Sequence, residues 1–413
     1  MPLSERSFFD LYAQNFVRAA VAIPRVALAD PAANAAQIAR LYADAAKDGA
    51  AIVLFPELAV SGYSLEDLHQ QEALLRSVLD ALAALVEATA GQEALLVVGA
   101  PLRLEGRLFN CAVVLSRGRI LGIVPKTYIP NYREFYEKRQ FASSRDALQR
   151  EIDCLGRRVP VGADLVFRCD EIPDLALHVE ICEDVWAPIP PSTYAALRGA
   201  TVLANLSASN ITVGKTAYRH LLAASQSGRC IAAYLYAAAG QGESTTDLAW
   251  DGHGMIYENG ELLAESERFR DESQVVAADL DLDRLVQERM RFTSFADCAT
   301  AHAGALSGLR RPRPRSSCGG RWIATPSCRP RPRSATRAAT RRTTSRSAPW
   351  RSACAPPGSG RSSSARAAGW TRRRRSSWPP APWTGSVCLG RTCSPTRCPG
   401  TPPPNARSRT RSG

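Results

Sequence analysis

The first 300 positions alternate short apolar runs with stretches in which apolar residues recur at helical spacing. Residues 16–28 form a run typical of a buried strand, and residues 31–50 place Ile38, Leu41 and Ala45 on one face of a helix. Similar patterns predict strands at 51–57, 95–102, 176–182, 201–207 and 230–238, and a helix over about 65–90.

Two turn signals predict hairpins in the same part of the chain. Residues 109–126 would turn at Arg117-Gly118, and residues 255–266 would turn at Asn259-Gly260, because such residue pairs accept the positive φ of a two-residue turn. Strands that alternate with helices indicate an α/β domain whose central sheets are covered by helices.

The last part of the chain, residues 301–413, has a different composition. It holds 24 of the 48 Arg and 16 of the 28 Pro, with no Lys, Asp or Glu, whereas residues 1–300 carry all 39 acids. The overall charge of +13 therefore comes from the tail, and a basic nucleic-acid binder is a poor interpretation of the first 300 residues. Without any hydrophobic period, residues 301–413 are predicted to be disordered.

Several classes of protein are disfavoured by simple patterns. No run of about 18 apolar residues predicts a membrane span, and the polar start MPLSERSFFD lacks the pattern of a secretory signal. The 12 Cys include no CxxC pair, so we expect reduced thiols in a cytoplasmic protein. We expect no metal site, and we interpret His178, His220 and His253 as structural because no ligand cluster is visible along the chain.

Three reactive side chains stand where predicted strands end: Glu57 after AIVLFPE, Lys126 after RILGIVPK, and Cys182 after ALHVEIC. Strand ends at one rim of a sheet are where α/β proteins place reacting groups. Together they suit amide hydrolysis through a thioester, with Glu57 as base and Lys126 beside the backbone N–H that follows Cys182 as oxyanion donors. Taken singly, each residue is more often a packed thiol or a solvated charge at the rim.

The segments LFPELAVSGYSLEDL, VPKTYIPNYREFYEKRQF and HVEICEDVWAPIPPS together resemble the nitrilase superfamily of carbon–nitrogen hydrolases. With residues 205–219 and 236–252, they are similar to the glutaminase domain of glutamine-dependent NAD synthetases over about residues 12–300. The resemblance implies a four-layer α-β-β-α sandwich for residues 1–300, followed by the tail. It also implies hydrolysis of L-glutamine to glutamate and ammonia.

The resemblance also implies roles for single residues. Cys182 would be the nucleophile, Glu57 the general base, and Lys126 the stabiliser of the tetrahedral intermediate, with Glu137 as an additional carboxylate beside Lys126. Tyr132, Ser209 and Lys215 match positions that contact glutamine in the family. The alternatives to glutamine contact are that Tyr132 packs under the loop, that Ser209 caps the next helix and that Lys215 is solvated.

The intact family passes ammonia to a second domain, which uses ATP, Mg²⁺ and deamido-NAD and needs an SGGxDS pyrophosphate loop; its members suggest homo-oligomers. That loop is absent from the chain as written. Residues 367–378 and 339–347 nevertheless admit codons whose neighbouring frame reads SGGLDSTQALIV and CYEAYNIQV. We therefore interpret residues 301–413 as an out-of-frame synthetase domain; a basic tail that binds nucleic acid is the alternative.

The predicted function is thus the glutaminase half of a glutamine-dependent NAD synthetase, needing no cofactor of its own. Two other classes stay open. A stand-alone amidase would use the same three residues on a different amide, and a binding protein on the same scaffold would turn over no amide at all.

Overall fold

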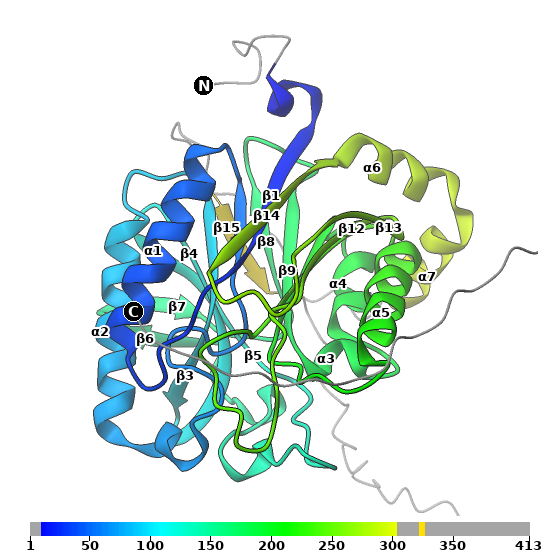
Figure 1. Ribbon diagram of the computed structural model, residues 1–413. Coiled ribbons are helices and arrows are strands. Elements are labelled where there is room, and N and C mark those ends of the chain that lie inside the picture. The colour runs from blue at the N-terminus through cyan, green and yellow to red at the C-terminus, as the bar shows by residue number, and fades with distance from the viewer. Residues whose placement is uncertain (1–9, 304–321, 327–413) are drawn as a thin grey trace, which may run out of the picture. The chain divides into compact units, whose positions relative to one another are not determined.

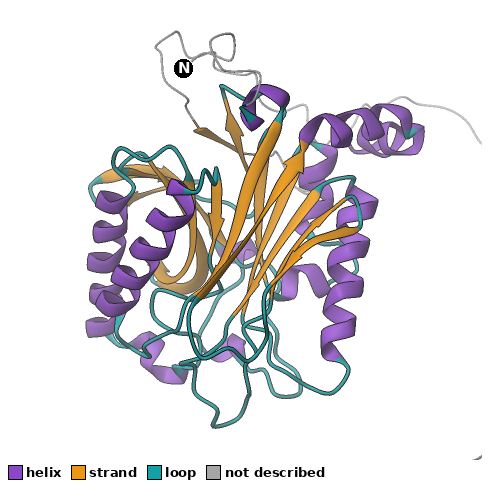
Figure 2. Cartoon of the chain, turned by 45° about the horizontal axis from the view of Figure 1, so that its top comes forward, coloured by secondary structure: helices purple, strands orange, loops and turns teal. Residues whose placement is uncertain are grey.

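The computed structural model describes residues 10–303 and 322–326 of the chain. Two β-sheets stack face to face, and helices cover the outer side of each sheet (Figures 1 and 2). The order of layers is therefore helix, sheet, sheet, helix, as the resemblance implies. The predicted disorder of residues 304–321 and 327–413 and their out-of-frame origin lie outside the described residues.

The first sheet has the strand order β14-β1-β2-β3-β4-β5, in which β1, β2 and β3 are parallel to one another. Parallel neighbours need a helical crossover, and two helices that follow β1 and β2 supply it on the outer face. The elements are β1 (Phe16–Ile23), α1 (Pro31–Lys47), β2 (Ile52–Leu54), α2 (Glu72–Ala88), β3 (Leu95–Leu104), β4 (Arg107–Ser116), β5 (Arg119–Pro125) and β14 (Gln274–Asp281).

The second sheet has the strand order β13-β12-β11-β10-β9-β8-β15, with β9, β10 and β11 parallel. Helices α4 and α5 pack against its outer face. The elements are β8 (Leu165–Cys169), β9 (Ala176–Ile181), α3 (Glu183–Trp186), α4 (Pro191–Leu197), β10 (Val202–Ser207), α5 (Lys215–Cys230), β11 (Ala233–Ala238), β12 (Gly254–Glu258), β13 (Glu261–Glu265) and β15 (Trp322–Pro326).

Smaller elements lie around the two sheets. Among the described residues they are η2 (Leu11–Gln14), η3 (Glu66–Gln70), η4 (Glu137–Arg139), η5 (Ser144–Asp146), the hairpin β6 (Glu151–Cys154) with β7 (Arg157–Pro160), α6 (Leu282–Arg291) and α7 (Thr293–Ala303). None of the helices in the described ranges has the length and apolar character needed to cross a bilayer.

The main core lies between the sheets, where Val21 and Leu54 of the first sheet face Val179 and Leu206 of the second. Two further apolar clusters fill the space between each sheet and its helices. The central strands are therefore buried on both faces, which explains why they read as continuous apolar runs and not as alternating patterns.

Both predicted hairpins are confirmed at their turns. Arg117 and Gly118 have φ of 51° and 70°, and Asn259 and Gly260 have φ of 47° and 88°, as a type I′ turn requires. The helix predicted over 65–90 is wrong in its continuity, because Gln71 is extended and separates η3 from α2.

Five strands of the described residues lie outside the predicted strand runs: β6, β7, β8, β14 and β15. β14 pairs antiparallel with β1 over eight residues, although its run QVVAADLD is only partly buried. β15 falls inside residues 301–413, the stretch predicted to be disordered. Its backbone pairs with β8, whose other neighbour is β9; without β15, β8 would be an edge strand with open hydrogen-bonding groups.

Candidate active site

Cys182 follows the last residue of β9 and directly precedes helix α3. Its backbone has φ of 42° and ψ of −97°, a conformation that non-glycine residues rarely adopt. The N–H of Cys182 donates to the carbonyl of Leu206 at 2.8 Å, which ties this turn to strand β10. A strained turn held by its neighbours indicates a functional position, because the fold must hold the residue against its own preference.

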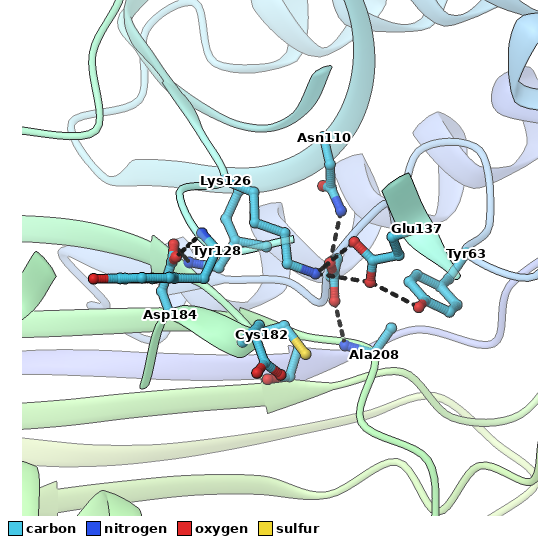
Figure 3. A network of polar contacts seen from close by, with 12 residues as sticks. Tyr63, Asn110, Lys126, Tyr128, Glu137, Cys182, Asp184 and Ala208 are labelled. Atoms are coloured by element: carbon cyan, nitrogen blue, oxygen red, sulfur yellow. Dashed lines mark hydrogen bonds and ion pairs between the residues drawn. The ribbon is translucent and has the colours of Figure 1, made fainter. Parts of the chain in front are cut away.

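Lys126 directly follows β5, and its side chain is fully buried. Its Nζ donates to Oε1 of Glu57 at 2.7 Å and to both carboxylate oxygens of Glu137 at 2.8 Å (Figure 3). Glu57, in the loop after β2, is only 1% exposed, and Glu137 opens η4. One ammonium therefore meets two carboxylates among buried side chains.

The Glu57 carboxylate is oriented by two further donors. Asn110 of β4 donates through Nδ2 to Oε1 at 2.6 Å, and the N–H of Ala208, just beyond β10, donates to Oε2 at 2.7 Å. Strands of both sheets thus hold this one carboxylate, and its geometry is set by the stacking of the two sheets.

Burial and the neighbouring charges shift the pKa values of Lys126 and Glu137. Burial alone would lower the pKa of Lys126, but the carboxylates of Glu137 and Glu57 outweigh it and raise that pKa well above its ordinary value. Burial raises the pKa of Glu137 to about 7, although Lys126 opposes the shift. Because two carboxylates share one cation, the cluster can take up a proton near neutral pH.

The Cys182 thiol lies beside this cluster. In Figure 3 its sulfur lies on the Lys126 side of the turn and close to Ala208. Burial, and after it the negative charge of Glu57, raises the pKa of the thiol, while Lys126 and the N–H of Ala208 act in the opposite direction. The thiol is therefore protonated at rest, and a base must remove its proton before it can attack a carbonyl.

The structure brings the four predicted catalytic residues together. Glu57 and Lys126 are buried and paired, so the alternative of solvated rim charges is wrong for both. A cavity of about 70 Å³ lies against Tyr63 and Glu137 and approaches the cluster from that side; Cys182 is not among its lining residues.

The three predicted substrate-binding residues lie around Cys182 in different settings. Tyr132 is half exposed, and its hydroxyl donates to Glu183, the residue after Cys182, at 2.9 Å. Ser209 is buried, and its hydroxyl oxygen accepts a hydrogen bond from Arg219. Lys215 begins α5 and donates to Asn210.

For the same three residues, the structure bears on the alternatives to glutamine contact, which are a solvated Lys215, a helix-capping Ser209 and a packed Tyr132. Burial lowers the pKa of Lys215, while the carboxylates of Glu134 and Glu183 oppose that shift, so this lysine is not simply solvated. Ser209 caps no helix, because Gly214 is the N-cap of α5. Tyr132 does not pack under the loop.

Four supporting groups were not predicted. Asn110 and the Ala208 N–H orient Glu57, the Tyr63 hydroxyl donates to Glu137 at 2.8 Å, and Asp184 accepts from the N–H groups of Thr127, Tyr128 and Ile181. Asp184 thereby joins the loop after Lys126 to the turn at Cys182 (Figure 3). A signal existed for Asn110, because a polar residue inside the run FNCAVV is a candidate for a buried hydrogen bond.

The comparison with known families decides the family. A profile described as carbon–nitrogen hydrolase matches residues 18–290, which is more than half of the chain. The chain belongs to the carbon–nitrogen hydrolase family. This carbon–nitrogen hydrolase is 52% identical over 305 residues to the glutamine-dependent NAD(+) synthetase of Mycobacterium tuberculosis and 50% identical over 304 residues to that of Mycobacterium leprae. Each match covers 74% of this chain and 45% of the relative, so the chain spans less than half the length of either.

Solved structures show the same fold. A glutamine-dependent NAD(+) synthetase from Cytophaga hutchinsonii matches with a TM-score of 0.57 at 24% identity, covering 64% of this chain and 43% of that one. A carbon–nitrogen hydrolase from Helicobacter pylori matches with a TM-score of 0.54 at 18% identity, covering 70% of this chain and 98% of that one. The nitrilase-type sandwich is thereby confirmed for this carbon–nitrogen hydrolase.

Proposed function

We propose that this domain hydrolyses the side-chain amide of L-glutamine to glutamate and ammonia. The observation that carries the proposal is the strained Cys182 beside a buried cluster in which Lys126 pairs with Glu57 and Glu137. The mycobacterial relatives named as glutamine-dependent NAD(+) synthetases support glutamine as the amide.

The first half of the reaction forms a thioester. Glu57 takes the proton of the Cys182 thiol, and the sulfur attacks the amide carbon. The oxyanion that forms accepts hydrogen bonds from the Lys126 ammonium and from the N–H of Glu183, the first residue of α3. When the intermediate collapses, the proton on Glu57 passes to the nitrogen, the carbon–nitrogen bond breaks and ammonia leaves.

The second half returns the enzyme to its starting state. Glu57 removes a proton from a water molecule, whose oxygen attacks the thioester carbon; the same two donors stabilise the second oxyanion. The carbon–sulfur bond then breaks, glutamate leaves, and the proton returns from Glu57 to the sulfur of Cys182. Glu137 keeps Lys126 charged throughout, because it remains an ion-pair partner when Glu57 is protonated.

Glutamine contact by Tyr132, Ser209 and Lys215 is part of the same proposal. These residues border Cys182 from the loop after β5, the loop after β10 and the start of α5. Lys215 lies 5.3 Å from the ring of Phe135 and 5.4 Å from that of Trp186, in a half-enclosed position where a cation suits a carboxylate.

We further propose that residues 1–300 form the glutaminase half of a longer enzyme. Ammonia would serve the ATP-dependent amidation of deamido-NAD, with Mg²⁺, in a synthetase domain whose residues are read out of frame after about 300–338. ATP and Mg²⁺ are assigned to that domain and to no described residue; homo-oligomers and a cytoplasmic location are expected of the intact enzyme. Sequencing of codons 290–345 tests the frame, and NAD formation by the purified chain from deamido-NAD, ATP and ammonia would contradict it.

The decisive test of the glutaminase is a pair of cysteine variants. Wild-type chain should release glutamate from glutamine, Cys182→Ala should lower that rate at least 10³-fold, and Cys298→Ala, at an exposed thiol on α7, should leave it unchanged. Turnover that survives Cys182→Ala overturns the nucleophile. Faster turnover of short aliphatic amides than of glutamine favours a stand-alone amidase, and glutamine binding without any turnover favours a binding protein.

A further inference from the structure

A second cluster of ligand-type side chains lies where α5 packs on the outer side of the second sheet. His220 of α5, His253 just before β12 and Glu265 at the end of β13 place one ligand atom each within 4.8 Å of one another. The sequence predicts that both histidines are structural because no cluster is visible along the chain. Folding creates the cluster from three separate segments, so spacing could not reveal it.

Both imidazoles point Nε2 at the same carboxylate oxygen. Nε2 of His253 lies 2.8 Å and Nε2 of His220 lies 3.3 Å from Oε1 of Glu265. Tetrahedral Zn²⁺, with bonds of about 2.0–2.2 Å to nitrogen and oxygen, separates its ligand atoms by roughly 3.4 Å. The two nitrogen–oxygen separations of 2.8 and 3.3 Å lie close to that value, and all three ligand atoms lie within 4.8 Å of one another.

We propose that His220, His253 and Glu265 form a binding site for a divalent first-row transition cation, with Zn²⁺ as the probe of choice. Two imidazoles and one carboxylate are a donor set that Zn²⁺ accepts, and the part-exposed side of Glu265 leaves room for a water as fourth ligand.

The surroundings favour the metal-binding state of the ligands. The Tyr257 hydroxyl lies 2.6 Å from Nδ1 of His220 and fixes that ring with Nε2 facing the cluster. The nearby Arg219 charge is neutralised by a two-oxygen ion pair with Asp251.

A cation here would connect α5 to the β12–β13 hairpin. The same helix begins at Lys215 and carries Arg219, which holds the carbonyls of Ser209 and Asn210 near the active site. Bound metal should therefore raise the thermal midpoint of unfolding, independently of any effect on turnover.

The test compares Zn²⁺ binding by the full chain and by matched variants after removal of metal with a chelator. Thiols are also Zn²⁺ ligands, and the chain carries six Cys in residues 301–413 besides Cys182, so the difference between variants is decisive and total metal is not. His220→Ala and Glu265→Gln should each remove one equivalent of binding, or weaken it at least 100-fold, and should abolish the metal-induced rise in the midpoint. His302→Ala, at an exposed histidine on α7, should change neither.

Two further measurements test the group that orients His220 and the type of ligand that binds the metal. Tyr257→Phe should weaken Zn²⁺ binding about 10-fold, because it removes only the group that orients His220. Co²⁺ bound at the site should show visible d–d bands without a thiolate charge-transfer band, and those bands should be lost in Glu265→Gln. Equal stoichiometry and affinity in wild type, His220→Ala and Glu265→Gln would overturn the site.

Discussion

Two buried cations of this molecule are held in opposite ways. Arg219 is neutralised by one carboxylate: its Nη1 donates to both oxygens of Asp251 at 2.7–2.8 Å, and its other N–H groups reach Ser209 and the carbonyl of Asn210. Lys126 instead meets two carboxylates, Glu57 and Glu137, although it is equally buried.

The two sites differ in whether the charges of the cation and its carboxylates balance. Every donor of the Arg219 guanidinium has an acceptor, and the charge of Asp251 cancels that of Arg219. The Lys126 cluster carries one negative charge too many and lies beside a protonated thiol. Burial of charge alone therefore does not identify a catalytic group; an unbalanced charge next to a nucleophile does.

The largest expected effect is the loss of the base. Glu57→Gln should lower kcat for glutamine 10³- to 10⁴-fold, because the new amide cannot accept the thiol proton. The unfolding free energy should change by less than about 2 kcal/mol, since removal of the excess charge offsets the misplaced amide beside the Ala208 N–H. Stopped assays of glutamate release and urea unfolding measure the two quantities. If Glu57→Gln loses stability and keeps its kcat, Glu57 is a structural partner of Lys126 and not the base.

In the Arg219–Asp251 pair, removal of the carboxylate should instead reduce stability strongly and kcat only slightly. Asp251→Asn should cost about 3–5 kcal/mol of unfolding free energy, because Arg219 stays charged and loses its buried partner. We expect kcat at saturating glutamine to change less than 10-fold in the protein that remains folded. The double replacement Arg219→Met with Asp251→Leu should recover most of the stability. If it does not, packing and not charge explains the loss.

The proposed catalytic trio could be predicted because each member closes a strand-like run, and in an α/β fold such ends meet at one rim. Glu57, Lys126 and Cys182 lie as that argument expects. The resemblance added Glu137, which lies 11 residues beyond Lys126 in a loop whose path no periodicity determines.

Other features depend on contacts that a linear pattern does not contain. The N–H of Ala208 is a backbone group, identical in sequence terms to any other, and its role exists only because β10 ends beside Glu57. The pairing of β14 with β1 joins residues more than 250 positions apart, and its exposed face weakens the apolar signal. His253 and Glu265 become neighbours through a β-hairpin, and His220 reaches them from a different layer.

A smaller effect is expected when the excess carboxylate is removed. Glu137→Gln should lower kcat about 10²-fold, because Glu57 then neutralises Lys126 alone and becomes a weaker base. In wild type, the folded chain holds a proton on Glu137 up to a pKa of about 7, which the unfolded chain releases at lower pH. Wild-type stability should therefore decrease, relative to the variant, as the pH rises towards 7.

That relative decrease should not exceed about 1.4 kcal/mol per pH unit, the slope for one proton. Urea unfolding of both proteins between pH 5 and 8 measures it. Parallel pH profiles for wild type and Glu137→Gln would show that the excess charge does not titrate, and the contrast with the Arg219 pair would lose its electrostatic basis.

The smallest effect should follow from the group that only supports Glu137. Tyr63→Phe removes a 2.8 Å hydrogen bond to Oε1 and keeps the edge contact with the ring of Trp250, so kcat should fall less than 10-fold. Loss of this donor disfavours the charged carboxylate, and the pH at which the cluster titrates should rise. Tyr136→Phe, whose hydroxyl meets the exposed Asp247 at 3.4 Å, is the matched control and should leave that pH unchanged. An equal shift in both variants would mean that the hydroxyls act through the loop and not through the charge balance at Lys126.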